Sequence, residues 1–168
     1  MTLRTVVFSS PWCRLVSEPQ RGEPYFLLEV PDYVAVVART GDARIVFVQQ
    51  HRPAVGGDTI ELPSGLVDSD ERPEDVARRE LLEETGMVAD RLELIGTLAP
   101  DVGRLVNRMW CYFAADVTPA RSWTSERGIT PLTVPEAEAL SMAADGRILH
   151  ALHVAVFFLA LRKRCLNP

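Results

Sequence analysis

Runs of apolar residues separated by short polar breaks dominate the first two thirds of the chain. Three runs rich in β-branched and aromatic residues, at 25–30, 33–40 and 43–51, predict strands. The first two are expected to pair, and the third follows the turn Gly41-Asp42. Because the runs are nearly continuous in apolar character, the strands are expected to be covered on both faces.

Further along the chain the breaks become more frequent. Residues 58–68 predict a short strand that enters a loop, because Pro63 and Gly65 interrupt regular structure there. Two more strands are predicted at 91–100 and 109–117. The segment up to Gly22 has a mixed pattern that assigns no element.

A helix is predicted from about Pro73 to Thr85. Proline suits the first helical turn, Glu74 and Asp75 favour the positive end of the helix dipole, and Gly86 is placed to end the helix. After a polar loop at 118–131, two more helices are predicted at 135–146 and 149–164.

This order of elements predicts an α/β fold in which a mixed sheet is sandwiched between helical layers. The length of 168 residues suits a single domain covering residues 1–168. Residues 1–30 are expected to form an N-terminal strand extension of that domain. No repeat or linker interrupts the pattern.

The net charge of −5 argues against nucleic acid as a partner, since that surface needs clustered lysine and arginine. Three dispersed cysteines without CxxC spacing make a disulfide framework or a zinc site unexpected. The N-terminus lacks a long apolar stretch typical of a secretory signal, and the longest apolar run is too short for a membrane span. Together these features favour the cytoplasm.

Three glutamates on the first predicted helix are the main chemical signal. Glu80, Glu83 and Glu84 lie at i, i+3 and i+4, which places their carboxylates on one side of the helix. Like charges at this spacing repel by roughly 0.2–0.5 kcal/mol per pair, so a cation is expected nearby. An acidic, solvated helix face is the simpler explanation for three glutamates alone.

The surrounding positions favour a metal site instead. The segment from residue 65 to residue 87 resembles the Nudix box, G-x5-E-x7-R-E-U-x-E-E-x-G-U, where U is a bulky apolar residue. The positions that match are Gly65, Glu71, Arg79, Glu80, Leu81, Glu83, Glu84, Gly86 and Met87. This resemblance implies the Nudix α/β/α sandwich and hydrolysis of a nucleoside diphosphate linked to another group, assisted by Mg²⁺ or Mn²⁺.

The resemblance also implies roles for single residues. Glu80 and Glu84 are the expected main metal ligands. Glu83 is expected to join them in the metal and catalytic site, together with the backbone carbonyl of Ser64. Arg79, which has Glu83 at i+4, is expected to act as an electrostatic brace. Glu71 is expected to approach the same cluster from the loop.

The flanks resemble the ADP-ribose pyrophosphatase branch of the Nudix family. The stretch FVQQHRPAVGGDTIELPSGLVD is similar to its Gln-Tyr-Arg-Pro and Glu-Leu-Pro-Ala-Gly motifs. Arg52 is then the candidate for the diphosphate, because a guanidinium suits bidentate contact with oxyanions. Glu61 is expected either to brace the loop or to bind substrate or metal, and Gly65 is a further candidate substrate contact.

One marker departs from that branch. Where ADP-ribose pyrophosphatases commonly carry Ser-Pro-Gly, this chain has Asp101-Val102-Gly103. Nucleotide sugars therefore stay open as an alternative substrate class. Arg104 and Arg108 add positive charge nearby, either for a phosphate or sugar-linked group or as surface residues.

A glutamate on a late loop often serves as general base in this branch. Glu126, which precedes the predicted strand GITPLTVP, matches that position best, although a surface role is nearly as plausible. Glu136 and Glu138 lie in the following helix and are expected to be solvated.

Aromatic residues and histidines complete the candidates. Trp12 is the first choice for stacking on a nucleobase, ahead of Tyr25 and of Trp110, which is expected in the core. His150 and His153 lie on an apolar helix and are expected to pack or to form hydrogen bonds. The branch commonly exchanges its N-terminal strands between subunits, which implies a homodimer.

Two alternatives to a diphosphatase remain. Some Nudix domains bind a nucleotide sugar without cleaving it, although usually next to a DNA-binding domain that this chain has no room for. Others hydrolyse damaged nucleoside triphosphates, and the ELPSG context favours the diphosphate-sugar branch over these.

Overall fold

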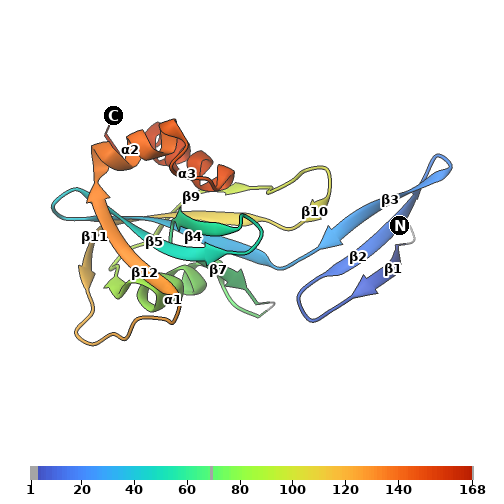
Figure 1. Cartoon of the computed structure of the whole chain (residues 1–168), viewed down its shortest axis with the longest axis horizontal. Helices are drawn as coiled ribbons and strands as arrows, with labels where there is room; N and C mark the ends of the chain where they lie inside the picture. Colours follow the sequence, from blue (N-terminus) through green and yellow to red (C-terminus); the bar gives the residue numbers. More distant parts are fainter. Residues whose placement is uncertain (1–3, 69, 168) are drawn as a thin grey trace.

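The computed structural model of the protein describes residues 4–68 and 70–167. A sheet with helices on both sides forms the body, and a ribbon of strands from the N-terminal part projects away from it (Figure 1). None of the helices in these two ranges is long and apolar enough to cross a membrane.

The main sheet is mixed, as predicted. Its central order is β12-β5-β4-β11-β8, with β6 beside β5, β7 beside β4, and β9 beside β11. The pair β4 and β11 is parallel, and the other pairs are antiparallel. The strands are β4 (Asp32–Thr40), β5 (Arg44–Arg52), β6 (Gly57–Glu61), β7 (Ser64–Val67), β8 (Met87–Val88), β9 (Glu93–Leu98), β11 (Met109–Pro119) and β12 (Ile129–Pro135).

Helices cover both faces of this sheet, which confirms the predicted sandwich (Figure 1). The helix α1 (Pro73–Thr85) packs on one face through Val76, Ala77 and Leu81. The helices α2 (Glu136–Asp145) and α3 (Ala151–Arg162) cover the other face, where Phe47 of the sheet meets Phe157 of α3. The central strand β4 contributes to both cores, since alternate residues of a strand point to opposite faces.

The projecting ribbon consists of β1 (Thr5–Ser9), β2 (Arg14–Gln20) and β3 (Glu23–Glu29), joined at its edge by β10 (Leu105–Val106). We call it the N-terminal arm. Several large apolar side chains on it are exposed, including Val7, Phe8 and Trp12. The arm therefore carries apolar surface that the body does not cover.

The predicted pairing of residues 25–30 with residues 33–40 is wrong. The first run lies in β3, which pairs with β2 and β10 in the arm, whereas the second is β4 of the body. The short link at Val30 and Pro31 carries the chain from one sheet to the other instead of reversing it in a hairpin.

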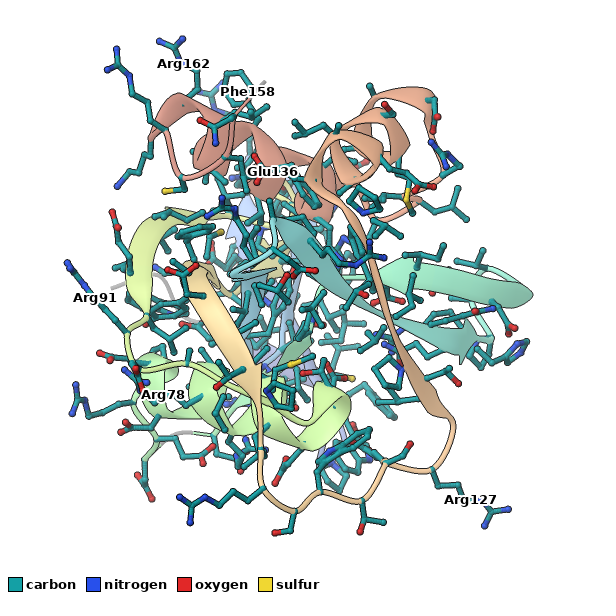
Figure 2. The ribbon with its side chains drawn as sticks, turned by 90° about the vertical axis from the view of Figure 1, so that its left-hand side faces the viewer. Arg78, Arg91, Arg127, Glu136, Phe158 and Arg162 are labelled. Atoms are coloured by element: carbon teal, nitrogen blue, oxygen red, sulfur yellow. The ribbon has the colours of Figure 1, made fainter. Side chains whose placement is uncertain are left out.

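Two local expectations also change. Residues 64–67 form β7 beside β4, so the chain resumes a strand directly after Pro63 where a loop was predicted. Glu136 was predicted to be solvated but is buried, because it starts α2 facing inward (Figure 2). Its carboxylate accepts hydrogen bonds from Arg39 Nε at 2.8 Å and from the Asn167 backbone N–H at 2.6 Å.

Candidate active site

A cleft of about 430 Å³ brings together residues from distant parts of the chain. The β5–β6 hairpin, β7, α1, the loop before β12 and the residue preceding α3 each contribute to its walls. The lining residues are Tyr33, Gln50, Arg52, Glu61, Ser64, Gly65, Leu66, Glu80, Glu84, Glu126, Ile129 and His150. Of the residues predicted from sequence, Arg52, Glu61, Ser64, Gly65, Glu80, Glu84 and Glu126 meet here.

Gly65 allows α1 to approach β7 closely. A Cβ atom on Gly65 would fall 2.1 Å from both the carboxyl carbon and Oε1 of Glu80, far inside van der Waals contact. Gly65 also pairs with Val34 of β4 in the sheet, so its backbone has little freedom to move away. The absence of a side chain at position 65 is therefore what gives the Glu80 carboxylate its place.

Glu84 is the most deeply buried acid on α1, with 4% of its surface exposed. Its Oε2 accepts a hydrogen bond from the Ser64 backbone N–H at 2.9 Å. Burial raises its pKa to about 8, and the negative charges of Glu80 and Glu126 act in the same direction. The Ser64 N–H and Arg52 oppose this rise without cancelling it.

Glu80 belongs to the same concentration of negative charge. Burial raises the pKa of its carboxyl above the ordinary value, and the charges of Glu83 and Glu126 add to this effect. Arg79 works in the opposite direction, since its Nη1 lies 2.7 Å from Glu80 Oε1. Acidic groups thus converge at one place, and a cation between them would relieve their mutual repulsion.

The three Nudix-box glutamates of α1, Glu80, Glu83 and Glu84, do not all face the cleft. A helix turns by about 100° per residue, so Glu84 is offset from Glu80 by only ~40°, whereas Glu83 lies ~100° from Glu84. Glu83 accordingly points outward, where its Oε2 accepts a hydrogen bond from Arg79 Nη1 at 3.0 Å. Arg79 Nη2 also lies 3.6 Å from Glu71 Oε2, so one guanidinium contacts Glu71, Glu80 and Glu83.

Arg52 and Glu61 form a paired wall on the β5–β6 hairpin. Arg52 Nε and Nη2 donate to the two carboxylate oxygens of Glu61 at 2.7 and 2.8 Å, and Thr59 Oγ1 donates to Oε1 as well. Burial alone would raise the pKa of Glu61, but the hydrogen bonds from Arg52 and Thr59 outweigh it and lower the pKa to about 2. Glu61 therefore braces Arg52, whose Nη1 is not engaged by this pair.

The donor set suits a hard divalent cation. Within residues 4–68 and 70–167, no three His, Cys, Asp or Glu side chains stand at metal-binding spacing. Glu80 is turned toward Arg79 and Glu84 toward the Ser64 N–H. Mg²⁺ needs only one or two carboxylates when substrate phosphates and water supply its other oxygens, so the residues present fit such an ion.

Some predicted contacts lie away from the cleft. Trp12 is 74% exposed at a turn of the N-terminal arm, beside Ser10 and Cys13. Arg104 lies over the ring of Tyr25, with its Cζ 4.5 Å from the ring centroid, and donates to the carbonyl of Phe26. Arg104 thus lies where the arm meets the β10 segment, and neither Trp12 nor Arg104 lines the cleft of the same chain.

Other cleft residues were not predicted as site residues. Tyr33 lies near the start of β4, Gln50 near the end of β5, and His150 directly before α3. Position in the sequence offers no signal for them, because only the packing of β5, β4 and α3 brings them to one wall. His153, by contrast, is the hydrogen-bonded core residue expected: its Nδ1 accepts from the Leu62 N–H at 3.1 Å.

An α/β/α sandwich whose edge holds clustered carboxylates beside a braced arginine defines a protein arranged to hold a cation and an anionic ligand together. The model of the NUDIX domain family matches residues 30–150, which include all of the cleft-lining residues. The chain belongs to the NUDIX family.

Two curated relatives illustrate the range of the family. The ADP-ribose pyrophosphatase of Bacillus subtilis is 39% identical over 69 residues, covering 41% of this chain and 37% of the relative. The GDP-mannose pyrophosphatase of Yersinia pestis is 31% identical over 115 residues, covering 62% of this chain and 57% of the relative. The matched segments thus span less than two thirds of either relative.

The fold extends beyond these segments. A crystal structure of an ADP compounds hydrolase superposes with a TM-score of 0.79 at 20% identity, covering 95% of this chain and 90% of that one. This likeness confirms the Nudix fold.

Proposed function

We propose that the chain hydrolyses the diphosphate linkage of a nucleoside diphosphate joined to a sugar, with ADP-ribose cleaved to AMP and ribose 5-phosphate as the first candidate. The observation that carries this proposal is the convergence of Glu80, Glu84 and Glu126 opposite Arg52 in one cleft. Carboxylates for a cation and a guanidinium for phosphate oxygens are the two groups that a diphosphate ester anion requires.

Each cleft residue has a role in this proposal. Glu80 and Glu84 hold Mg²⁺ or Mn²⁺ together with the Ser64 carbonyl, and Arg79 keeps Glu80 oriented. Arg52 binds a diphosphate oxygen through the nitrogen that Glu61 leaves free. When bound, the cation neutralises charge that develops on the phosphate oxygens and lowers the pKa of water.

Glu126 is the candidate general base. It lines the same cleft as Glu80 and Glu84, and its charge raises the pKa of both. A carboxylate at this position accepts the proton of the attacking water as the new phosphorus–oxygen bond forms. The bond between the attacked phosphorus and the bridging oxygen breaks, and sugar phosphate and nucleoside monophosphate leave as the products.

The sugar is open between two classes. The named activity of the Bacillus subtilis relative favours ADP-ribose, and that of the Yersinia pestis relative favours GDP-mannose. Val102 occupies the position of the branch's marker proline, and its side chain is 93% exposed. The loss of this marker weakens the argument for ADP-ribose over other nucleotide sugars. Two alternatives use the same acidic cluster. A triphosphate hydrolase would cleave nucleoside triphosphates in preference to diphosphate sugars, and a binding module would hold a diphosphate sugar without turnover.

A substrate panel with product identification tests the proposal. ADP-ribose, GDP-mannose, other nucleotide sugars and oxidised triphosphates are offered with Mg²⁺ or Mn²⁺, and ¹⁸O-labelled water shows which phosphorus is attacked. We expect turnover of a diphosphate sugar and a loss of roughly a hundredfold or more in Glu84→Gln, because several kcal/mol of transition-state stabilisation is removed. Glu138→Gln, an exposed glutamate on α2, is the matched control.

Binding of every panel compound without turnover would replace the proposal with a sensor function. Full activity of Glu84→Gln would remove the metal site from it.

The exposed apolar side chains of the N-terminal arm support a homodimer. Val7, Phe8 and Trp12 would be covered if two arms packed together or onto a partner body. Light scattering of the whole chain is expected to return twice the monomer mass, and a monomer at all concentrations would remove this part of the proposal.

A further inference from the structure

Trp123 ties the loop between β11 and β12 to the end of α1. Its indole N–H donates a hydrogen bond to the backbone carbonyl of Glu83 at 2.9 Å. Its ring lies against Gly86, so closely that a Cβ atom on this glycine would fall 2.7 Å from Cδ2 of the indole. One side chain thus contacts two positions of the Nudix box, at the C-terminal end of α1.

The loop is otherwise held only at its ends. At one end, the Ala120 N–H donates to the carbonyl of Gly86 at 2.8 Å. At the other, Ile129 begins the pairing of β12 with β5. Residues 121–127 between them are exposed, and the hydrogen bonds of Ser125 stay within the loop and its junction with β12.

Glu126 lies in this exposed stretch, three residues after Trp123. It lines the cleft and also a second hollow of about 440 Å³, which Glu83 and Trp123 line as well. Glu126 thus belongs to the walls of both spaces. An exposed loop of this length has many conformations, and ordering a residue in it costs about 1–2 kcal/mol of backbone entropy.

We propose that Trp123 is a positioning residue that holds Glu126 over the cleft by anchoring the loop to Glu83 and Gly86. Gly86 then has two tasks, since it ends α1 with a positive φ of 69° and also provides the bare surface on which the indole rests. The role for Glu126 rests on the function proposed above, whereas the anchoring of the loop does not depend on it.

Hydrogen exchange tests the anchor without any substrate. Wild-type protein is compared with Trp123→Ala, Trp123→Phe and Arg127→Ala, a neighbouring loop residue whose side chain points away from the body (Figure 2). We expect faster exchange of the hydrogen-bonded Ala120 and Ile129 amides in Trp123→Ala, a smaller change in Trp123→Phe, whose ring still covers Gly86, and no change in Arg127→Ala. Unchanged exchange in Trp123→Ala would overturn the proposal, whether or not the protein is an enzyme.

Steady-state kinetics then tests the link to Glu126 on the substrate that the panel identifies. We expect Trp123→Ala to lose about 10- to 100-fold in kcat with little change in KM, since misplacing a catalytic group by ~1 Å has this scale of effect. Arg127→Ala is expected to retain wild-type kcat, and Trp123→Phe to recover most of it.

A double-mutant cycle shows whether Trp123 acts through Glu126. If it does, Trp123→Ala combined with Glu126→Gln is no slower than Glu126→Gln alone. Multiplying losses in the double variant would overturn the positioning role, because they would show that Trp123 acts independently of this carboxylate. An inactive wild-type enzyme with an anchored loop would instead refute the proposed function.

Discussion

Gly65 of β7 and Glu80 of α1 are packed so tightly that even a methyl group at position 65 would lie 2.1 Å from the Glu80 carboxyl carbon. The two residues are the first glycine and the first helical glutamate of the Nudix box, and they belong to different elements. Their contact explains why the motif combines a glycine on a strand with an acid on a helix.

Gly65→Ala is expected to displace the Glu80 carboxylate while leaving the fold intact. Because Glu80 is a proposed metal ligand, turnover should fall by about a hundredfold or more. Enzyme assays over a range of Mg²⁺ concentrations check this, with Gly41→Ala in the remote β4–β5 turn as the control, where the added Cβ meets its nearest neighbour at 3.8 Å. Equal activity of the two variants would mean that Glu80 is not held by this contact.

Gly86→Ala and Gly146→Ala form a matched pair for stability. Both glycines end helices with positive φ, at 69° and 84°, so each alanine carries a left-handed strain of about 1–2 kcal/mol. Of the two positions, only 86 faces an indole, and overpacking there should destabilise the protein by a further ~1–3 kcal/mol. Urea unfolding measures the loss of unfolding free energy in each variant. Equal losses would show that the Trp123 ring moves aside without loss of stability.

Glu61→Gln should weaken substrate binding through Arg52. The amide no longer balances the guanidinium charge, so Arg52 loses its fixed orientation and KM should rise more than kcat falls. Initial-rate kinetics checks this against Glu138→Gln, which alters an exposed ion pair with Arg147. A fall in kcat at constant KM would place Glu61 in the chemical step instead.

The same pair predicts a change in acid stability. The folded pKa of Glu61 is about 2, below its ordinary value of 4.5, so the pair stabilises the protein above pH 4.5 and this contribution is lost as pH falls toward 2. Glu61→Gln should therefore unfold with a weaker dependence on pH in that window. Urea unfolding at pH 3 and pH 6 measures how much the unfolding free energy of each protein changes with pH. An equal change in the parent and in Glu61→Gln would argue against the lowered pKa of Glu61.

His153 is expected to make stability depend on pH in a second, higher pH range. Burial lowers its pKa to about 3, with the neighbouring His150 acting in the same direction. Since unfolded histidine titrates near 6.5, stability is complete above pH 6.5 and falls as pH drops toward 3, by about 1–2 kcal/mol at pH 5. His153→Asn keeps an acceptor for the Leu62 N–H without titrating, so its unfolding free energy should vary less between pH 7 and 5.

His51→Asn, at an exposed histidine of β5, is the control for that experiment. If the unfolding free energies of the parent and of His153→Asn change equally between pH 7 and 5, then His153 is protonated as easily in the folded protein as in the unfolded chain.

The parts of the fold that the sequence predicts well are those set by interactions between residues close together in the chain. The helix at 73–85 was expected from Pro73, the acids after it and Gly86, and α1 has these bounds. Such signals act within one turn of the chain, so they survive whatever packs around them. The Nudix box likewise identified the family, which the match over residues 30–150 confirms.

Strand pairing was less accessible, because it depends on contacts between distant segments. Residues 25–30 and 33–40 looked like a hairpin, yet Leu28 pairs with Leu105 in the arm and Val34 pairs with Trp110 in the body. Both arrangements satisfy the same apolar pattern, and only the tertiary fold chooses between them.

The candidate site divides in the same way. The sequence by itself determined that Glu80 and Glu84 share a helical face and that Gly86 ends their helix, since spacing along one helix sets these relations. The tertiary structure alone decided that Glu126 and Arg52 join them while Trp12 and Arg104 do not, and that Trp123 rests on Gly86. Those contacts arise from the packing of a loop and two strands against α1, and no local periodicity encodes them.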